Sequence, residues 1–173
     1  MTMPYQIITD SSCDLPQELA DSYGLIVLPL SLTVDHKTYK NYLDGREIGF
    51  HELYEKFRSG SQTSTCAVNP EAFIEVMEPC LKEGRDIFYI GFSSGLSTTY
   101  QSGAIACGEL REKYPERKLI AIDSLCASLG EGLLLYLAAK KQQSGASIDE
   151  VADYVRETIP HLCHWFTVND LMF

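Results

Sequence analysis

A turn rich in glycine and hydroxyl side chains is the part of the sequence best suited to chemistry. The segment Gly91-Phe-Ser-Ser-Gly95 has the G-x-S-x-G pattern that places a serine nucleophile on a sharp turn between a strand and a helix. Asp123, and then His161 or His164, follow in the order Ser, Asp, His. Ser93 could therefore be the nucleophile of a serine esterase, although the sequence has no His-Gly-Gly-Gly segment for an oxyanion hole.

The same turn could instead bind an anion. Glycines let the backbone approach a ligand, and hydroxyl groups and helix N-terminal amides donate hydrogen bonds to a carboxylate or phosphate. The hydroxyl groups are those of Ser93, Ser94, Ser97 and Thr99, and a second set is offered by Thr63 and Ser64. Ordinary polar turns and caps use the same residue types, so all three interpretations stay open at this point.

Short apolar runs alternate with helical patterns along the chain. Strands are expected at Tyr5–Thr9, Leu25–Val34, Ile87–Ile90, Leu119–Ile122 and Cys163–Val168. Helices are expected from Leu15, over Phe50–Phe57, from Asn69, from Tyr100, over Leu129–Lys141 and from Ser147 to Thr158. Strands separated by helices need crossover connections, so we predict an α/β fold with a mostly parallel sheet and helices on both faces, forming a single domain over residues 1–173.

Local signals predict where some of these elements begin and end. Capping boxes are expected at Asp14 with Gln17 and at Ser147 with Glu150. Pro29 cannot donate to a strand ladder, so its strand should be short, bulged or at a sheet edge. Residues 35–45 are expected to be an excursion from the core, and residues 61–68 a loop.

The loops that follow the strands should share one rim of the sheet, because the carboxyl ends of parallel strands lie on the same side. These loops are Asp10–Asp14, Ser93–Thr99 and Asp123–Ser128. In open α/β sheets ligands bind at this rim. The first and third loops add four candidate binding residues, which are Asp10, Ser11, Asp123 and Ser124.

Composition excludes several classes of function. The 14 basic and 24 acidic residues give a net charge of −10, which repels nucleic acid and anionic lipid surfaces. The sequence has no apolar run long enough to span a bilayer and does not start like a signal peptide, so we expect a cytoplasmic protein without stable membrane insertion.

The six cysteines are scattered without zinc-ligand spacing, and no metal site is predicted. A phosphoryl-transfer enzyme would need a reactive histidine in the rim loops, and none is evident there.

Several segments, in this order along the chain, resemble the DegV family, bacterial fatty-acid-binding proteins that present an acyl carboxylate to a fatty acid kinase. They are Ile8-Thr-Asp-Ser-Ser-Cys-Asp-Leu15, Tyr42-Leu-Asp-Gly45, Thr63-Ser64 with Pro70-Glu-Ala-Phe73, Ser93-Ser-Gly-Leu-Ser-Thr-Thr-Tyr-Gln-Ser102 and Asp123-Ser-Leu-Cys-Ala-Ser-Leu-Gly-Glu-Gly132. The resemblance implies a carrier without catalytic residues or cofactor. Its ligand would be a long-chain fatty acid, with Thr63 or Ser64 and Ser93 or Ser94 bound to the head group and the acyl chain buried.

Three features depart from the family pattern. Thr63-Ser-Thr-Cys-Ala67 stands for the usual Thr-Ser-Gln-Pro-Ser, and Ser97-Thr-Thr99 for Ser-Gly-Thr. Val168–Phe173 resembles the segment that normally continues into Gly-Gly-Arg and a second, lid domain. We therefore expect a truncated form equivalent to the N-terminal domain, whose open lipid groove a homodimer or a partner chain could cover.

Overall fold

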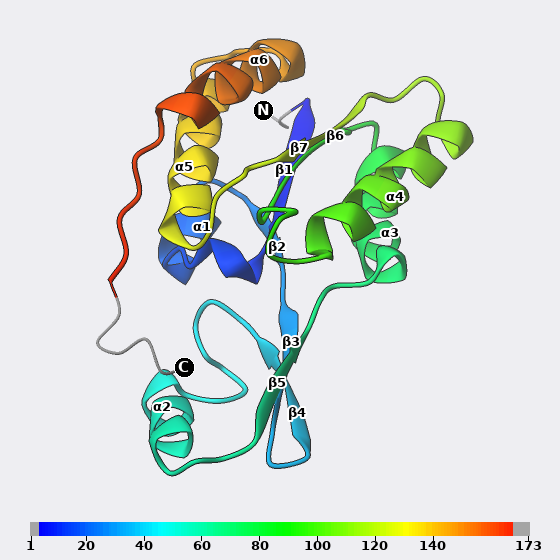
Figure 1. The fold of residues 1–173 in the computed structure, drawn as a ribbon. Coiled ribbons are helices and arrows are strands. Elements are labelled where there is room, and N and C mark those ends of the chain that lie inside the picture. Colours follow the sequence, from blue (N-terminus) through cyan, green and yellow to red (C-terminus); the bar gives the residue numbers. More distant parts are fainter. Residues whose placement is uncertain (1–3, 168–173) are drawn as a thin grey trace.

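The centre of the molecule is a four-stranded parallel sheet (Figure 1). The computed structural model describes residues 4–167. Its sheet has the strand order β2-β1-β6-β7, formed by Ile26–Leu28, Tyr5–Asp10, Asp86–Gly91 and Leu119–Asp123. The predicted α/β fold with a mostly parallel sheet is therefore correct for this part of the chain.

Helices cover both faces of the parallel sheet (Figure 1). One face carries α1 (Gln17–Ser22), α5 (Leu129–Gln143) and α6 (Ile148–Thr158), and the other carries α3 (Pro70–Lys82) and α4 (Thr99–Lys113). Successive side chains of a strand point to opposite faces. Along β6, Phe88 and Ile90 accordingly join the first core, whereas Ile87 and Tyr89 join the second.

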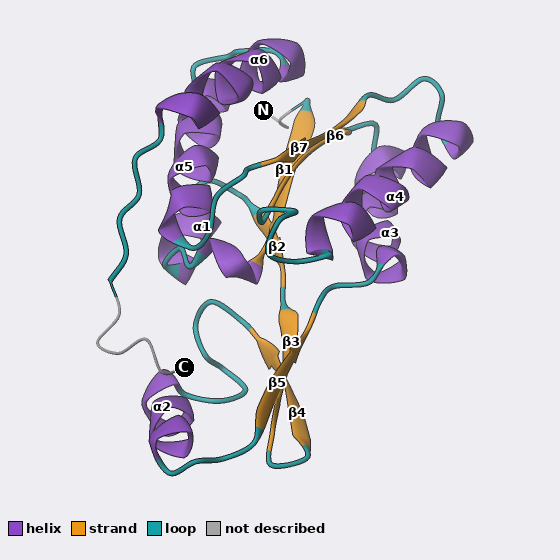
Figure 2. Cartoon of the chain, in the orientation of Figure 1, coloured by secondary structure: helices purple, strands orange, loops and turns teal. Residues whose placement is uncertain are grey.

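A second sheet, three-stranded and antiparallel, lies beyond the end of the first (Figure 2). Its strand order is β4-β3-β5, formed by Lys37–Asn41, Leu30–Val34 and Thr63–Cys66, and α2 (Phe50–Arg58) accompanies it. The expectation of strands separated by helices throughout was wrong here, because the excursion and the loop each contain a strand. Pro29 divides the second apolar run between the two sheets, which leaves β2 short and at a sheet edge, as predicted.

The hairpin between β3 and β4 lacks the usual sequence signal. Asp35 and His36 form its two-residue turn with φ values of 48° and 67°. Such turns need positive φ at both central positions and strongly favour Asn-Gly or Asp-Gly. The flanking strands hold the Asp-His turn in this geometry. The turn residues alone therefore could not predict the hairpin.

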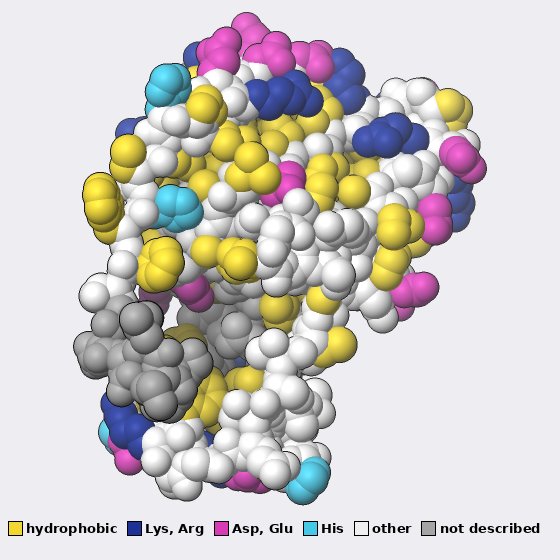
Figure 3. Space-filling model, in the orientation of Figure 1, with side chains coloured by type: hydrophobic (Ala, Val, Ile, Leu, Met, Phe, Trp, Pro, Cys, Tyr) yellow, Lys and Arg dark blue, Asp and Glu magenta, His cyan; other side chains and the backbone are white. Residues whose placement is uncertain are grey.

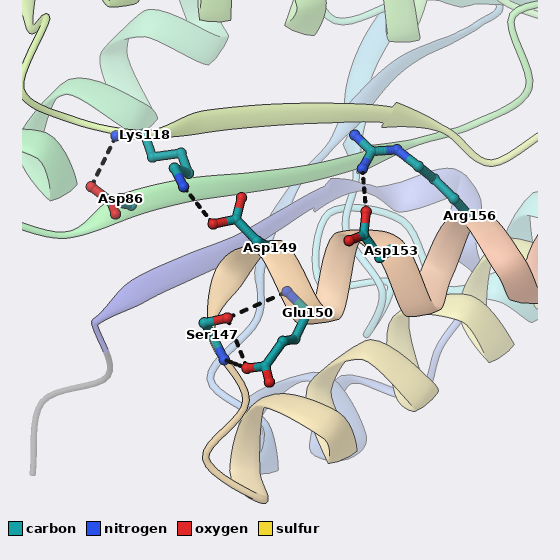
Figure 4. Close-up of polar contacts among 7 residues, drawn as sticks. All are labelled: Asp86, Lys118, Ser147, Asp149, Glu150, Asp153 and Arg156. Carbon is teal, nitrogen blue, oxygen red and sulfur yellow. Dashed lines mark hydrogen bonds and ion pairs between the residues drawn. The ribbon is translucent and has the colours of Figure 1, made fainter.

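Of the two predicted capping boxes, the structure contains one. The Ser147 amide donates to Glu150 Oε2 at 2.8 Å and the Glu150 amide to Ser147 Oγ at 3.4 Å (Figure 4). The box at Asp14 was wrong. Asp14 has φ 52° and ends a short 3₁₀ helix over Ser11–Cys13, and α1 begins after Pro16 without a side-chain cap.

The last predicted strand does not form in the described part of the chain. Residues 162–167 have no regular secondary structure, and Val168 lies outside the described residues. The side chains of Trp165 and Phe166 are 95% and 94% exposed, so their apolar character does not reflect a buried strand.

Two glycines of α4 allow a matched test of the packing between α4 and β6. A Cβ atom at Gly103 would lie 2.7 Å from Tyr89 Cζ, whereas one at Gly108 meets nothing within 4 Å. We expect Gly103→Ala to lower the free energy of unfolding by about 1–3 kcal/mol through overpacking. Gly108→Ala should raise it by about 0.5–1 kcal/mol, because alanine is the better helix former. Urea denaturation of both variants measures the difference, and equal effects would contradict the close approach.

Candidate functional site

The three predicted rim loops lie against one another at the carboxyl ends of β1, β6 and β7. Backbone amides of the β6–α4 loop donate to both neighbours: Phe92 N to Asp10 Oδ2 at 3.3 Å, Ser93 N to the carbonyl of Cys126 at 3.0 Å, and Ser94 N to Asp123 Oδ1 at 3.1 Å. The structure therefore brings Asp10, Ser93, Ser94 and Asp123 together at one rim.

Asp10 and Ser11 hold the first loop in place. Asp10 is fully buried and its carboxylate also accepts a hydrogen bond from the Ser12 amide at 3.0 Å. Burial raises the pKa of Asp10 even though these amide donors act in the opposite direction. Ser11 Oγ accepts a hydrogen bond from the Leu30 amide at 3.0 Å, which ties the start of β3 to the rim. Both side chains are thus used by the fold itself.

The hydroxyl turn does not have the geometry of a nucleophile elbow. The φ angle of Ser93 is not positive, and α4 begins only at Thr99. Ser93 Oγ accepts a hydrogen bond from the Gly95 amide at 3.3 Å. Ser97 Oγ accepts one from the Thr99 amide at 3.2 Å and shares another with Thr99 Oγ1 at 3.0 Å. Ser94 is half-buried, and among the described residues only its backbone amide has a hydrogen-bond partner.

Two carboxylates accept hydrogen bonds from backbone amides that an anionic ligand would need as donors. Besides Ser94, Asp123 Oδ1 accepts a hydrogen bond from the Leu125 amide at 3.1 Å. Ser124 is buried, and its Oγ accepts a hydrogen bond from the Cys126 amide at 3.1 Å. Because Asp10 and Asp123 already bind the amides of Phe92 and Ser94, a ligand at this rim must rely mainly on hydroxyl donors.

Thr63 and Ser64 lie apart from this rim. Both are exposed on β5, where they pair with Val34 and Thr33 of β3. Thr33 is three residues, or about 10 Å of strand, beyond Leu30, at which Ser11 binds β3. No hydrogen bond among residues 4–167 joins β5 to the β6–α4 loop. The structure does not bring the two hydroxyl sets together.

Glu131 is a buried carboxyl group that the sequence analysis missed. It is fully buried in the first turn of α5, and its Oε1 accepts a hydrogen bond from the Thr9 hydroxyl at 2.7 Å. Its Oε2 has no partner among the described residues. Burial, and next the negative charge of Asp10, raise the pKa of Glu131 well above its ordinary value. A single acid within Leu129–Ala139, which is otherwise apolar or small, was the available sequence signal.

An apolar pocket of about 380 Å³ opens beside the hydroxyl turn. It is lined by Leu96, by Leu125–Gly130 and by His164–Phe166. The side chains of Leu96 and Leu129 are 68% and 59% exposed. Apolar side chains also gather over the parallel-sheet part of the face drawn in Figure 3, with charged groups mainly toward its margins. Exposed leucines of this kind mark a surface that favours an apolar ligand or partner.

Residues 4–173 match the family model described as "Uncharacterised protein, DegV family". A DegV domain-containing protein of Clostridium perfringens is 41% identical over 167 residues, which cover 96% of this chain. Among solved structures, a fatty-acid-binding DegV family protein from Thermus thermophilus has a TM-score of 0.80 and 30% identity over 91% of this chain. A DegV lipid-binding protein from Thermotoga maritima has a TM-score of 0.79 and 25% identity over 92%.

The chain spans little more than half the length of these proteins. It covers 57% of the clostridial relative, 54% of the Thermus chain and 55% of the Thermotoga chain. Among the described residues, no helix is long and apolar enough to cross a membrane.

Glu131 should make the stability of the fold depend on pH. Its pKa is raised in the folded state, so the folded chain holds a proton that the unfolded chain releases above pH about 4.5. The stabilisation is complete below that pH and is lost as pH rises toward the raised pKa, by up to about 1.4 kcal/mol per pH unit. Asp10 shifts in the same direction, and the Glu131→Gln substitution isolates the part due to Glu131.

We expect Glu131→Gln to become more stable relative to the unsubstituted chain as pH rises from 5 to 8.5. Urea denaturation across this range measures the difference in free energy of unfolding. Glu112→Gln, at an exposed site on α4, is the control for loss of one negative charge. A difference that stays constant with pH would contradict a raised pKa for the buried Glu131 carboxyl group.

Proposed function

The chain belongs to the DegV family, and from this premise we propose that it binds a long-chain fatty acid in the apolar pocket beside the hydroxyl turn. The observation that carries the proposal is this pairing of an open apolar pocket with a group of hydroxyl donors at the same rim. The fatty acid binding described for the Thermus relative supports it.

The acyl chain supplies most of the affinity in this proposal. Burying about fifteen methylene groups at ~0.8 kcal/mol each is worth on the order of 12 kcal/mol before the costs of association. Leu96, Leu125 and Leu129 offer the apolar surface for it.

The carboxylate head is bound by hydroxyl groups. Ser94 is the leading donor, with Ser93 and Ser97 beside it, because the amides of Phe92 and Ser94 are already bound by carboxylates. A hydrogen bond to a charged group contributes roughly 1.5–3 kcal/mol, enough to fix the position of the head. Thr63 and Ser64 stay a prediction as head-group residues, because their strand belongs to the other sheet.

We further propose that the bound acid is presented to a fatty acid kinase in the cytoplasm. In this role the chain has no catalytic residue of its own, and the head group must remain accessible at the rim. A second copy or a partner chain could cover the apolar surface. Formation of acyl phosphate by a bacterial fatty acid kinase, with and without this chain, tests the partnership.

The pocket assignment predicts a local effect of one leucine. Leu129→Ser should weaken palmitate binding about tenfold, because it removes roughly 1.4 kcal/mol of apolar contact. The control is Ile105→Ser at a 52% exposed site on α4. Isothermal titration calorimetry of both variants measures the affinity. If both lose affinity equally, or neither does, the acyl chain lies elsewhere.

The head-group assignment predicts opposite effects at two neighbouring residues. Ser94→Ala should weaken palmitate binding about tenfold or more and leave methyl palmitate binding unchanged, because only the acid has a charged head. Asp123→Asn keeps an oxygen for the Ser94 amide and removes a negative charge, so it should strengthen palmitate binding several-fold. Loss of methyl palmitate binding in Ser94→Ala would instead indicate a damaged pocket.

A further inference from the structure

The first turn of α5 presents one surface to the apolar pocket and another to the parallel sheet. Leu129 and Gly130 line the pocket, and the Leu129 side chain is 59% exposed. Glu131, the next residue along the helix, is fully buried. The wall of the pocket and the buried carboxyl group therefore belong to the same short piece of backbone.

A single side-chain hydrogen bond attaches this turn to the sheet. The Thr9 hydroxyl of β1 donates to Glu131 Oε1 at 2.7 Å. Ser128 precedes the helix without a side-chain cap, and no other side chain of residues 128–132 forms a hydrogen bond within the described part of the chain. The state of the Glu131 carboxyl group thus bears directly on where the pocket wall lies.

The surroundings of Glu131 do not compensate a negative charge. Its Oε2 has no hydrogen-bond partner among residues 4–167. The titratable groups that interact with it from the elements packed around it are all acids, namely Asp10 of β1, Cys13 of the 3₁₀ helix, Asp14 after that helix, Tyr89 of β6 and Cys126 of the β7–α5 loop. The base next to this turn is His164, which is exposed and packs against Gly130 on the pocket side.

An ionised Glu131 could reach water only by moving the turn that carries it. Burial and the charge of Asp10 raise the pKa of Glu131, because the ionised form would be desolvated without a cation. The backbone leaves little room for local adjustment, since a Cβ atom at Gly132 would lie 2.7 Å from the Cys13 carbonyl oxygen. The protonated carboxyl group is therefore the form that fits the closed position of the turn.

We propose that Glu131 is a positioning residue whose proton controls the affinity of the acyl-chain pocket. With the proton bound, the first turn of α5 stays against β1, and Leu129 and Gly130 complete the pocket wall. When Glu131 loses the proton, the turn moves toward water and the acyl chain is released. This regulation rests on the proposed function, which supplies the ligand, and adds to it a release step at higher pH.

The affinity for methyl palmitate tests the proposal, because this ligand has no ionisable group of its own. Isothermal titration calorimetry between about pH 6 and 9.5 should show an affinity that falls as pH rises through the pKa of Glu131. The fall is at most about tenfold per pH unit, since one proton is involved. Glu131→Gln should keep the low-pH affinity throughout. Glu112→Gln, at an exposed site on α4, should follow the unsubstituted chain.

The Thr9 hydroxyl gives a second variant with a directional result. Its hydrogen bond lowers the pKa of Glu131, in opposition to burial. Thr9→Val keeps the shape of the side chain and removes this bond, so the loss of methyl palmitate affinity should move to higher pH. A role of Glu131 in packing alone would not shift the pH profile in this way.

NMR spectroscopy of the ligand-free chain separates this proposal from the proposed function. The amide shifts of Leu129 and Gly130 should titrate in the unsubstituted chain and not in Glu131→Gln. Titrating shifts without ligand binding by any variant would overturn the carrier function and still support the role of Glu131. Three results would overturn that role: shifts that are independent of pH, a pH dependence that persists in Glu131→Gln, or one that disappears in His164→Gln.

Discussion

The carboxylate of Asp10 is the interaction on which the rim of this molecule depends. A buried carboxylate is tolerated only where donors satisfy it, and here the amides of Ser12 and Phe92 do so from two different loops. The neighbours of Asp10 extend the same connection. Thr9 binds Glu131 of α5, and Ser11 binds the first amide of β3. Three consecutive residues thus join the parallel sheet, a helix and the antiparallel sheet.

The same carboxylates shape what the rim can bind. Asp10 and Asp123 use amides that would otherwise point at an anion, and their charges oppose one. A carboxylate ligand must then be held mainly by its acyl chain and by hydroxyl donors. This favours a long apolar ligand over a small polar acid. The lining of the pocket beside the turn agrees, because it contains exposed leucines and no lysine or arginine.

Much of the fold could be predicted because its signals are local. Alternating strands and helices, the helix start at Ser147 and the break at Pro29 each depend on a few adjacent residues. The antiparallel sheet could not be predicted, because β5 is exposed, β4 is exposed or only half-buried, and both lack a hydrophobic pattern. Asp14 is a residue type that often caps helices, but here it ends the preceding 3₁₀ turn in a left-handed conformation.

The sequence by itself determined the layered α/β fold and the three loops that form its rim, since periodicity and strand direction are sufficient for both. Only the tertiary structure decided which polar groups remain available there. The partners of Phe92 and Glu131 lie 82 and 122 residues away along the chain, and short-range patterns carry no information on such contacts.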